Sequence, residues 1–126
     1  MIPPEIISRV LKSVDSDELI DLTRELVRIN YVWDPVAGTC EQPAADRVTK
    51  WAEKQGFEVR QDEVEVARPN VLVTWTAGLG KRKMMFEGHT DVVTPGKLAD
   101  WQYNPFGAEI VGRRMYGRGS CDTKGN

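Results

Sequence analysis

The chain has 126 residues, a formal net charge of −2, 40% hydrophobic residues and 29% charged residues. These values fit one ordinary globular domain with a core of its own. Lys and Arg form no basic stripe, which argues against a nucleic-acid partner. No apolar run approaches the roughly 20 residues that cross a bilayer, and the first residues lack the basic and apolar regions of a signal peptide. We therefore expect a cytoplasmic protein without a nucleic-acid or membrane partner.

Apolar residues at helical spacing predict three helices, which we expect to turn their apolar faces toward a core. The first spans residues 3–14, and its two opening prolines suit a first helical turn. Its apolar face consists of Ile6, Ile7, Val10, Leu11 and Val14. The second helix follows Asp15, which with Glu18 resembles a capping box. Its apolar face consists of Leu19, Leu22, Leu26 and Ile29.

The third predicted helix begins at Glu41 or Pro43 and ends at Gln55, followed by Gly56 in the left-handed conformation. Residues 30–42 between the second and third helices are expected to form a loop. Its aromatic residues Tyr31 and Trp33 either pack this loop onto the domain or line a substrate entrance. Cys40 and Cys121 are expected to be free thiols, because a reducing cytosol disfavours a disulfide between them.

Three strands follow at residues 57–66, 70–76 and 83–87, and a turn at 78–81 separates the last two. Met84, Met85 and Phe86 of the third strand are expected to be buried. Residues 108–116 predict a short hairpin that leads into a final glycine-rich loop. Helices followed by apolar strands indicate an α/β fold, in which helices pack on a mixed β-sheet.

The residues with the clearest chemical potential are His89, Asp91 and Asp122. His89, the only histidine, follows a predicted strand end, where α/β sheets commonly bind ligands. In an extended segment Asp91 would share the face of His89 and accept a hydrogen bond from one ring nitrogen, leaving the other for a divalent metal. Asp122, among small neighbours, could approach one metal or bridge two.

Each of these signals is weak when taken alone. A His-x-Asp pair is more often a structural hydrogen bond than a metal site, and Gly117-Arg118-Gly119 could be only a tight turn. The loop matches neither a phosphate-binding Walker A sequence nor the dinucleotide-binding fingerprint. Arg118 is expected to support the loop, and Lys124 to be a surface charge or a helix-start charge.

The ordered set of motifs is far more specific than any member. It consists of Gly88-His89-Thr90-Asp91-Val92-Val93, then Trp101 with Pro105-Phe106, then Tyr116-Gly117-Arg118-Gly119, then Asp122-Thr123-Lys124-Gly125. This set resembles the M20 family of metallopeptidases and N-acyl-amino-acid hydrolases, which includes acetylornithine deacetylase and succinyl-diaminopimelate desuccinylase. The resemblance covers most of the chain, including Arg68-Pro69-Asn70-Val71.

The resemblance implies the N-terminal part of a zinc-exopeptidase-like (phosphorylase/hydrolase-like) catalytic domain. It makes His89 a ligand of one zinc, Asp122 the carboxylate that bridges two zincs, and Asp91 the catalytic residue that orients His89. Co²⁺ or Mn²⁺ could replace Zn²⁺. The Asp122–Thr123 peptide bond would be cis, and family members commonly have Met where this chain has Thr123. Substrates would be N-acyl amino acids or small peptides, hydrolysed by metal-activated water.

The family's general-base glutamate, its further metal ligands and its smaller second domain lie downstream of the residues present here. Residues 1–126 are therefore expected to be a partial catalytic domain, cut after the bridging-aspartate loop and inactive alone. Exposed strand edges and helix faces would favour self-association or pairing with the missing C-terminal portion. The alternatives are a non-catalytic fragment or pseudo-enzyme, and a single-zinc structural site, for which the ligands are too few. The sequence leaves deacylase and exopeptidase activity equally open.

Overall fold

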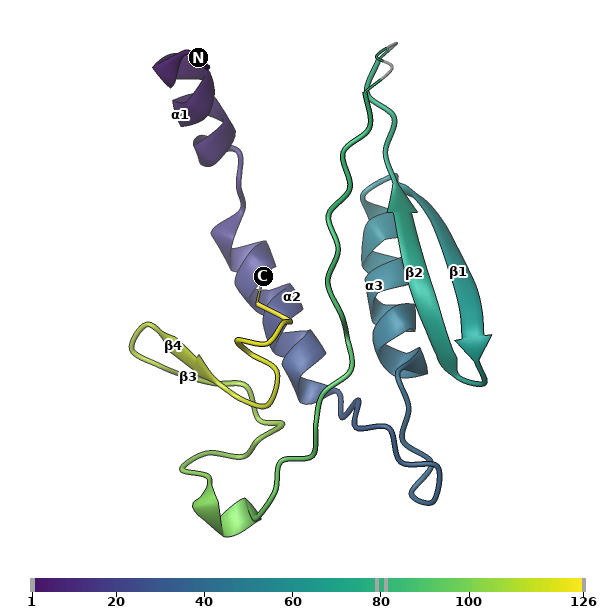
Figure 1. The fold of residues 1–126 in the computed structure, drawn as a ribbon. Helices are drawn as coiled ribbons and strands as arrows, with labels where there is room; N and C mark the ends of the chain where they lie inside the picture. The colour runs from purple at the N-terminus through teal and green to yellow at the C-terminus, as the bar shows by residue number, and fades with distance from the viewer. Residues whose placement is uncertain (1, 79, 81, 126) are drawn as a thin grey trace.

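The computed structural model describes residues 2–78, 80 and 82–125. Three helices come first, and two pairs of strands follow, separated by a long extended segment (Figure 1). The helices are α1 (Pro4–Lys12), α2 (Ser16–Arg28) and α3 (Gln42–Lys54), and the strands are β1 (Glu58–Glu65), β2 (Arg68–Thr74), β3 (Glu109–Val111) and β4 (Arg114–Tyr116), with a short 3-10 helix, η1 (Leu98–Asp100), before β3. The α/β prediction is confirmed. No helix among the described residues is long and apolar enough to cross a membrane.

The ends of α2 and α3 follow from local chemistry. The Asp15 carboxylate accepts hydrogen bonds from the backbone N–H groups of Asp17 and Glu18, both at 3.0 Å, and so caps the N-terminus of α2. Glu18 does not complete the expected capping box, because its carboxylate accepts hydrogen bonds from Trp51 and Gln55 instead. Gly56 has a φ of 82° and ends α3 as predicted.

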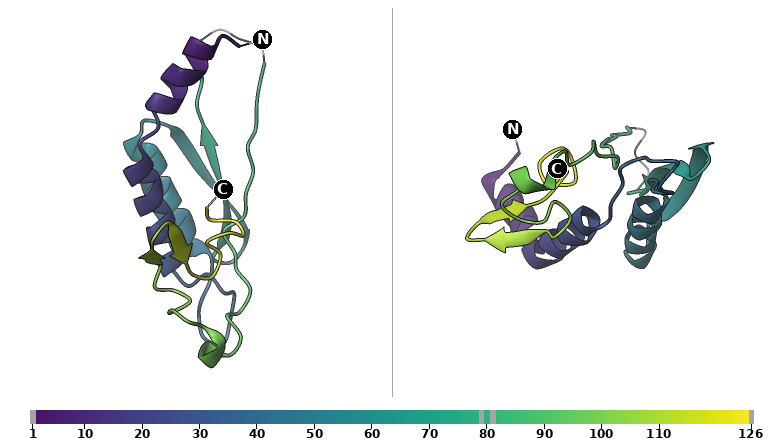
Figure 2. Two further views of the ribbon diagram at one scale, coloured as in Figure 1. Left: turned by 90° about the vertical axis from the view of Figure 1, so that its left-hand side faces the viewer. Right: turned by 90° about the horizontal axis from the view of Figure 1, so that it is seen from below.

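Helix α3 packs on one face of the antiparallel β1–β2 pair, as the right-hand view of Figure 2 shows. The register runs from Glu58 opposite Thr74 to Glu65 opposite Arg68, with an irregularity between Glu63 and Glu65. Strand β2 therefore begins two residues earlier than expected and includes Pro69. The second pair, β3 and β4, is the predicted hairpin and is also antiparallel.

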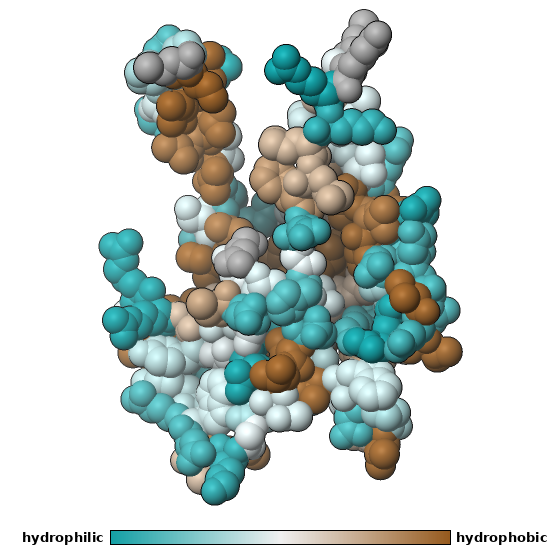
Figure 3. Space-filling view, viewed as in Figure 1, coloured by the Kyte–Doolittle hydropathy of each residue, from teal (hydrophilic) through white to brown (hydrophobic). Residues whose placement is uncertain are grey.

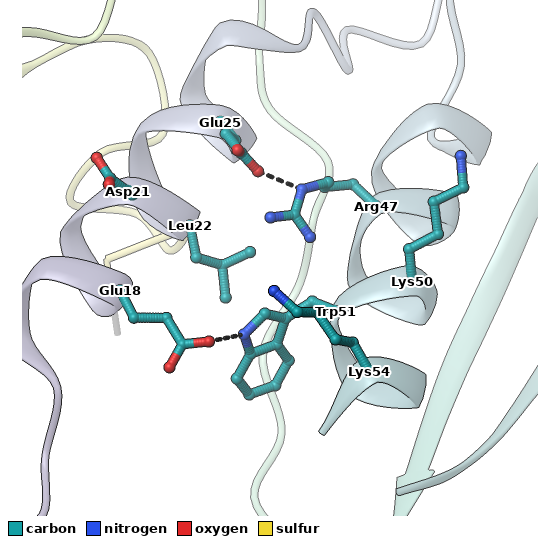
Figure 4. Close-up of a pocket in the computed structure, with 8 residues that line it drawn as sticks. All are labelled: Glu18, Asp21, Leu22, Glu25, Arg47, Lys50, Trp51 and Lys54. Carbon is teal, nitrogen blue, oxygen red and sulfur yellow. Dashed lines mark hydrogen bonds and ion pairs between the residues drawn. The ribbon is translucent and has the colours of Figure 1, made fainter. Parts of the chain in front are cut away.

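Helices α2 and α3 face each other across a polar groove of about 350 Å³ (Figure 4). The α2 side of the groove is acidic and the α3 side basic. Arg47 pairs with Glu25, and the Trp51 indole N–H donates to Glu18 at 3.0 Å. Exposed ion pairs of this kind contribute little stability, about 0–1 kcal/mol each. The ion pair across the groove therefore contributes little to the stability of the fold.

A small apolar cluster lies where the loop after α2 meets the long extended segment. Tyr31, Ala44 and Val92 form its buried centre, and Leu26, Ile29, Val32 and Phe106 pack around them. Tyr31 is fully buried, so of the two roles considered for it, packing of the loop is the one observed. Trp33 is 50% exposed, and the Arg68 guanidinium lies 5.5 Å from the centre of its ring.

The predicted third strand is absent, and the expectation that it would be buried was wrong. Residues 82–97 contain no strand, and Figure 1 shows them running extended between α2 and α3. Met84, Met85 and Phe86 are 81–86% exposed. An apolar run becomes a strand only when another strand pairs with its backbone, and no described residue provides that strand. The turn expected at residues 78–81 includes Leu79 and Lys81, which lie outside the described residues.

The core-facing role predicted for α1 was also wrong. None of its residues is buried, and Ile6, Ile7, Val10 and Leu11 are 40–68% exposed. The space-filling view shows this apolar surface as a brown region over α1 (Figure 3). The helical spacing was read correctly, but no other described element packs against this face. The exposed area makes α1 a candidate surface for association.

Candidate metal site

The His89 imidazole is oriented on one side by the residue two positions further on. Its Nδ1 lies 3.1 Å from the backbone oxygen of Asp91 and 3.2 Å from the Asp91 carboxylate oxygen Oδ1. Both contacts are available because the segment is extended, so that alternate residues share one face. A proton on Nδ1 is therefore stabilised by two acceptors, which leaves Nε2 as the ring nitrogen for other partners.

The other ring nitrogen of His89 faces Asp122, which is 33 residues away in the sequence. The distance between His89 Nε2 and Asp122 Oδ1 is 3.1 Å. The Asp122–Thr123 peptide bond is cis, as the resemblance implied. The structure thus brings together all three residues singled out from the sequence. Asp91 lies at Nδ1 of the His89 ring, and Asp122 lies at Nε2.

The loop that carries Asp122 is held by backbone hydrogen bonds. Arg118 N–H donates to the carbonyl of Pro105 at 2.6 Å, and Lys124 N–H donates to the carbonyl of Gly119 at 2.9 Å. Gly119 has a φ of 80°, which favours glycine. A Cβ at Gly117 would collide with the side chain of Val27, which is fully buried in α2. The glycines here are needed for close packing of the loop onto α2 and for its turn.

The backbone of Arg118 makes hydrogen bonds that hold the loop, whereas its side chain contacts an aromatic ring and its buried Nε has no hydrogen-bond partner among the described residues. Its guanidinium carbon lies 5.1 Å from the centre of the Trp101 ring. The Trp101 indole N–H donates in turn to the carbonyl of Pro95 at 2.8 Å. Trp101, one of the motif residues, therefore connects the glycine-rich loop to the segment that follows His89.

The site is open and electrostatically favourable for a proton on His89. The side chains of His89, Asp91 and Asp122 are 50%, 56% and 88% exposed, and they line a pocket of about 220 Å³. The hydrogen bond with Asp122 is the largest effect and raises the pKa of His89 above its ordinary value; burial opposes it, and the backbone oxygen of Asp91 adds a further, smaller increase. A metal at Nε2 would compete with that proton.

The donor atoms suit a divalent transition metal as part of a larger ligand set. Tetrahedral ligands about 2.0–2.1 Å from zinc are separated by about 3.3 Å. The 3.1 Å between His89 Nε2 and Asp122 Oδ1 is close to that separation. In the part of the chain that the structure describes, no three His, Cys, Asp or Glu side chains are grouped to hold a metal. His89 and Asp122 therefore offer two donor groups of the kind that a divalent metal takes.

Sequence reasoning missed the environment of Lys124, for which it predicted a surface or helix-start charge. Lys124 is only 8% exposed, and its Nζ lies 4.1 Å from the centre of the Tyr31 ring. Burial lowers the pKa of Lys124 to about 8. No periodicity marks this position, because burial of Lys124 depends on Tyr31, which is far away in the sequence. Cys40 and Cys121 are free, as expected.

Known proteins resemble this chain over most of its length. Residues 85–126 match the model of peptidase family M20/M25/M40. The succinyl-diaminopimelate desuccinylase of Methylocella silvestris is 38% identical over 110 residues, which are 84% of this chain and 26% of that protein. Those of Rhodospirillum centenum and Rhodopseudomonas palustris are 38% and 33% identical, over 84% and 86% of this chain and 27% of each relative. The chain thus spans about a quarter of the length of these relatives.

Proposed function

We propose that this chain, which belongs to the peptidase family M20/M25/M40, provides part of the catalytic site of a metal-dependent amide hydrolase. The observation that carries the proposal is the pair of contacts made by His89. Its Nδ1 faces Asp91 at 3.2 Å, and its Nε2 faces Asp122 at 3.1 Å. A carboxylate that holds one ring nitrogen in place while the other points at a second carboxylate is a common arrangement around a bound metal.

Each of the three residues has a distinct role in this proposal. Asp91 keeps the proton of His89 on Nδ1 and fixes the orientation of the ring, so that Nε2 binds the metal. Asp122, with 88% of its side chain exposed, would supply its carboxylate to the metal site. Two zinc ions, or Co²⁺ or Mn²⁺ in their place, would supply an activated water and polarise the amide carbonyl.

The proposed substrates are N-acyl amino acids or small peptides. The relatives named above are desuccinylases of an acylated amino acid, which favours deacylation. Exopeptidase activity is the second possibility within the same chemistry. Both reactions break an amide bond, so the pocket around His89 and Asp122 serves either. The cytoplasmic location expected from the sequence stays a prediction.

We expect the 126-residue chain alone to be inactive. His89 and Asp122 offer two ligand side chains, and a catalytic zinc usually has three. A missing general base costs roughly 10²–10⁴-fold in rate. Hydrolysis of N-acetyl and N-succinyl amino acids by the purified chain, abolished by a chelator, would contradict this expectation.

Calorimetric titration with Zn²⁺ tests the metal-binding part of the proposal. The wild-type chain should bind Zn²⁺, and His89→Ala and Asp122→Asn should each weaken binding at least tenfold. Asp100→Asn is the matched control, because Asp100 is an exposed carboxylate on η1. If all four proteins bind equally, or none binds, the proposed ligands are wrong.

The second candidate is a non-catalytic role through self-association or a complementing chain. The observation that favours it is the exposed apolar surface on α1 and at Met84, Met85 and Phe86. Monomeric proteins rarely expose large contiguous apolar patches. Light scattering that finds a clean monomer at high concentration would count against this candidate.

A further inference from the structure

Lys124 is buried beneath the loop that carries Asp122, and its ammonium group contacts two separate parts of the chain. Its Nζ lies 4.1 Å from the centre of the Tyr31 ring, within the range of a cation–π interaction. The same atom donates a long hydrogen bond of 3.5 Å to the carbonyl oxygen of Arg118. Lys124 therefore connects the segment after α2 to the glycine-rich loop.

The burial of this cation is unusual, because lysine is almost never fully buried unless it is paired. No carboxylate pairs with Lys124 among the residues that the structure describes. The Tyr31 ring and one carbonyl oxygen are its only polar or aromatic partners there. A side chain needed only to fill space at this position would be better served by an uncharged residue of similar length.

The stem of Lys124 and the side chain of Val92 both lie close to Gly119. A Cβ at Gly119 would lie 2.7 Å from the Val92 side chain and 3.1 Å from Cε of Lys124. Val92 directly follows Asp91 and belongs to the same buried cluster as Tyr31. One set of contacts thus joins the segment of His89 and Asp91 to the loop of Asp122.

We infer that Lys124 is a positioning residue, whose ammonium group on the Tyr31 ring holds the 117–122 loop so that Asp122 meets His89. Only the consequence of this positioning, a correctly formed metal site, rests on the proposed function. The geometry itself can be tested without metal.

The experiment compares variants of the 126-residue chain by NMR, with ¹⁵N label in the His89 ring and in the backbone. Asp122→Asn supplies the reference signal for a His89 ring without its carboxylate partner. Lys124→Met keeps the length of the side chain and removes the charge, and Lys124→Arg keeps the charge. Lys97→Met is the matched control, because Lys97 is exposed.

We expect Lys124→Met to fold. The hydrogen-exchange protection of the backbone amide at position 124 should fall at least tenfold, and the His89 Nε2 signal should shift toward that of Asp122→Asn. Lys124→Arg should keep most of the exchange protection and a His89 Nε2 signal close to that of the wild type. Lys97→Met should change neither quantity. A folded Lys124→Met with wild-type protection and a wild-type His89 signal would overturn the inference.

A second pair of variants decides the matter if Lys124→Met does not fold. Tyr31→Phe keeps the ring beneath the ammonium, and Tyr31→Leu removes it. The inference predicts that only Tyr31→Leu shifts the His89 signal, and equal signals in both variants would contradict it. Failure to bind Zn²⁺ leaves these metal-free readouts unaffected, so the inference and the proposed function fail separately.

Discussion

His89 and Asp122 meet at 3.1 Å although 33 residues separate them in the sequence. The contact joins a glycine-rich loop to an extended segment, whose Val92 belongs to the buried cluster of Tyr31. Because His89 is the only histidine, its ring reports on this contact without ambiguity.

The first prediction concerns the protonation of His89. Its pKa should lie above 6.5, because the Asp122 carboxylate and the Asp91 backbone oxygen stabilise the charged ring. The stabilisation is fully present below pH 6.5 and is lost as the pH rises through the raised pKa. An NMR titration of the ring measures this, and Asp122→Asn should lower the pKa. An unchanged pKa in that variant would show that the carboxylate contact is absent in solution.

The second prediction uses the pKa of Lys124, which burial lowers to about 8 from the ordinary 10.5. Between these values the unfolded chain binds a proton that the folded chain has released, so stability should rise with pH. Over the 1.5 pH units measured, the gain is of the order of 1–2 kcal/mol, because one pH unit corresponds to about 1.4 kcal/mol for one proton. Urea denaturation between pH 8 and pH 9.5 should show the rise in the wild type. Lys124→Met should lack it, and equal slopes would contradict a lowered pKa.

The third prediction is that Gly117→Ala destabilises the fold. The added methyl group would collide with the buried side chain of Val27, and overpacking of this kind costs typically 1–3 kcal/mol. Gly80→Ala is the control, because nothing lies within 4 Å of a Cβ at that position. The free energy of unfolding from urea titration distinguishes the two variants. Similar stabilities would mean that the loop does not pack against α2 as described.

The fourth prediction is that Tyr31→Phe is tolerated or slightly stabilising. The Tyr31 hydroxyl is buried and has no hydrogen-bond partner among the residues that the structure describes. An unsatisfied buried polar group costs about 1–3 kcal/mol, and its removal relieves that cost while the ring remains. Thermal unfolding of the variant measures the change. A loss of several degrees in Tm would indicate that the hydroxyl has a partner, such as a bound water.

The fifth prediction concerns the apolar face of α1. Ile7 and Leu11 are 47% and 68% exposed and lie one helical turn apart. Ile7→Glu combined with Leu11→Glu should reduce self-association, because it interrupts the apolar surface without touching buried residues. Analytical ultracentrifugation at several concentrations checks this. The double variant Arg9→Glu and Lys12→Glu is the control, and an equal effect there would point to charge instead.

Elements specified by neighbouring residues were predicted well from the sequence. Asp15 caps α2, Gly56 ends α3, and the hairpin at 108–116 forms as expected, because each depends on residues close in the chain. The third strand and the burial of α1 failed for the opposite reason. Both depend on a distant partner for an apolar surface, and periodicity indicates such a surface without saying what covers it.

The residues of the candidate site also differ in how well the sequence predicted them. Residue type and spacing singled out His89, Asp91 and Asp122, and in the structure each aspartate lies within 3.2 Å of one ring nitrogen of His89. The environment of Lys124 could not be predicted, because its burial follows from Tyr31, more than 90 residues earlier in the chain. Only the packed structure puts these two residues in contact.

The central claim is that His89 binds metal through Nε2 while Asp91 retains the proton on Nδ1. Titration of the ¹⁵N-labelled chain with Zn²⁺ tests it most directly, because the two ring nitrogens give separate NMR signals. We predict that Zn²⁺ shifts the Nε2 resonance, that Nδ1 stays protonated, and that Asp122→Asn greatly weakens the response. A shift at Nδ1 instead, or no response to Zn²⁺ at either nitrogen, would contradict the claim.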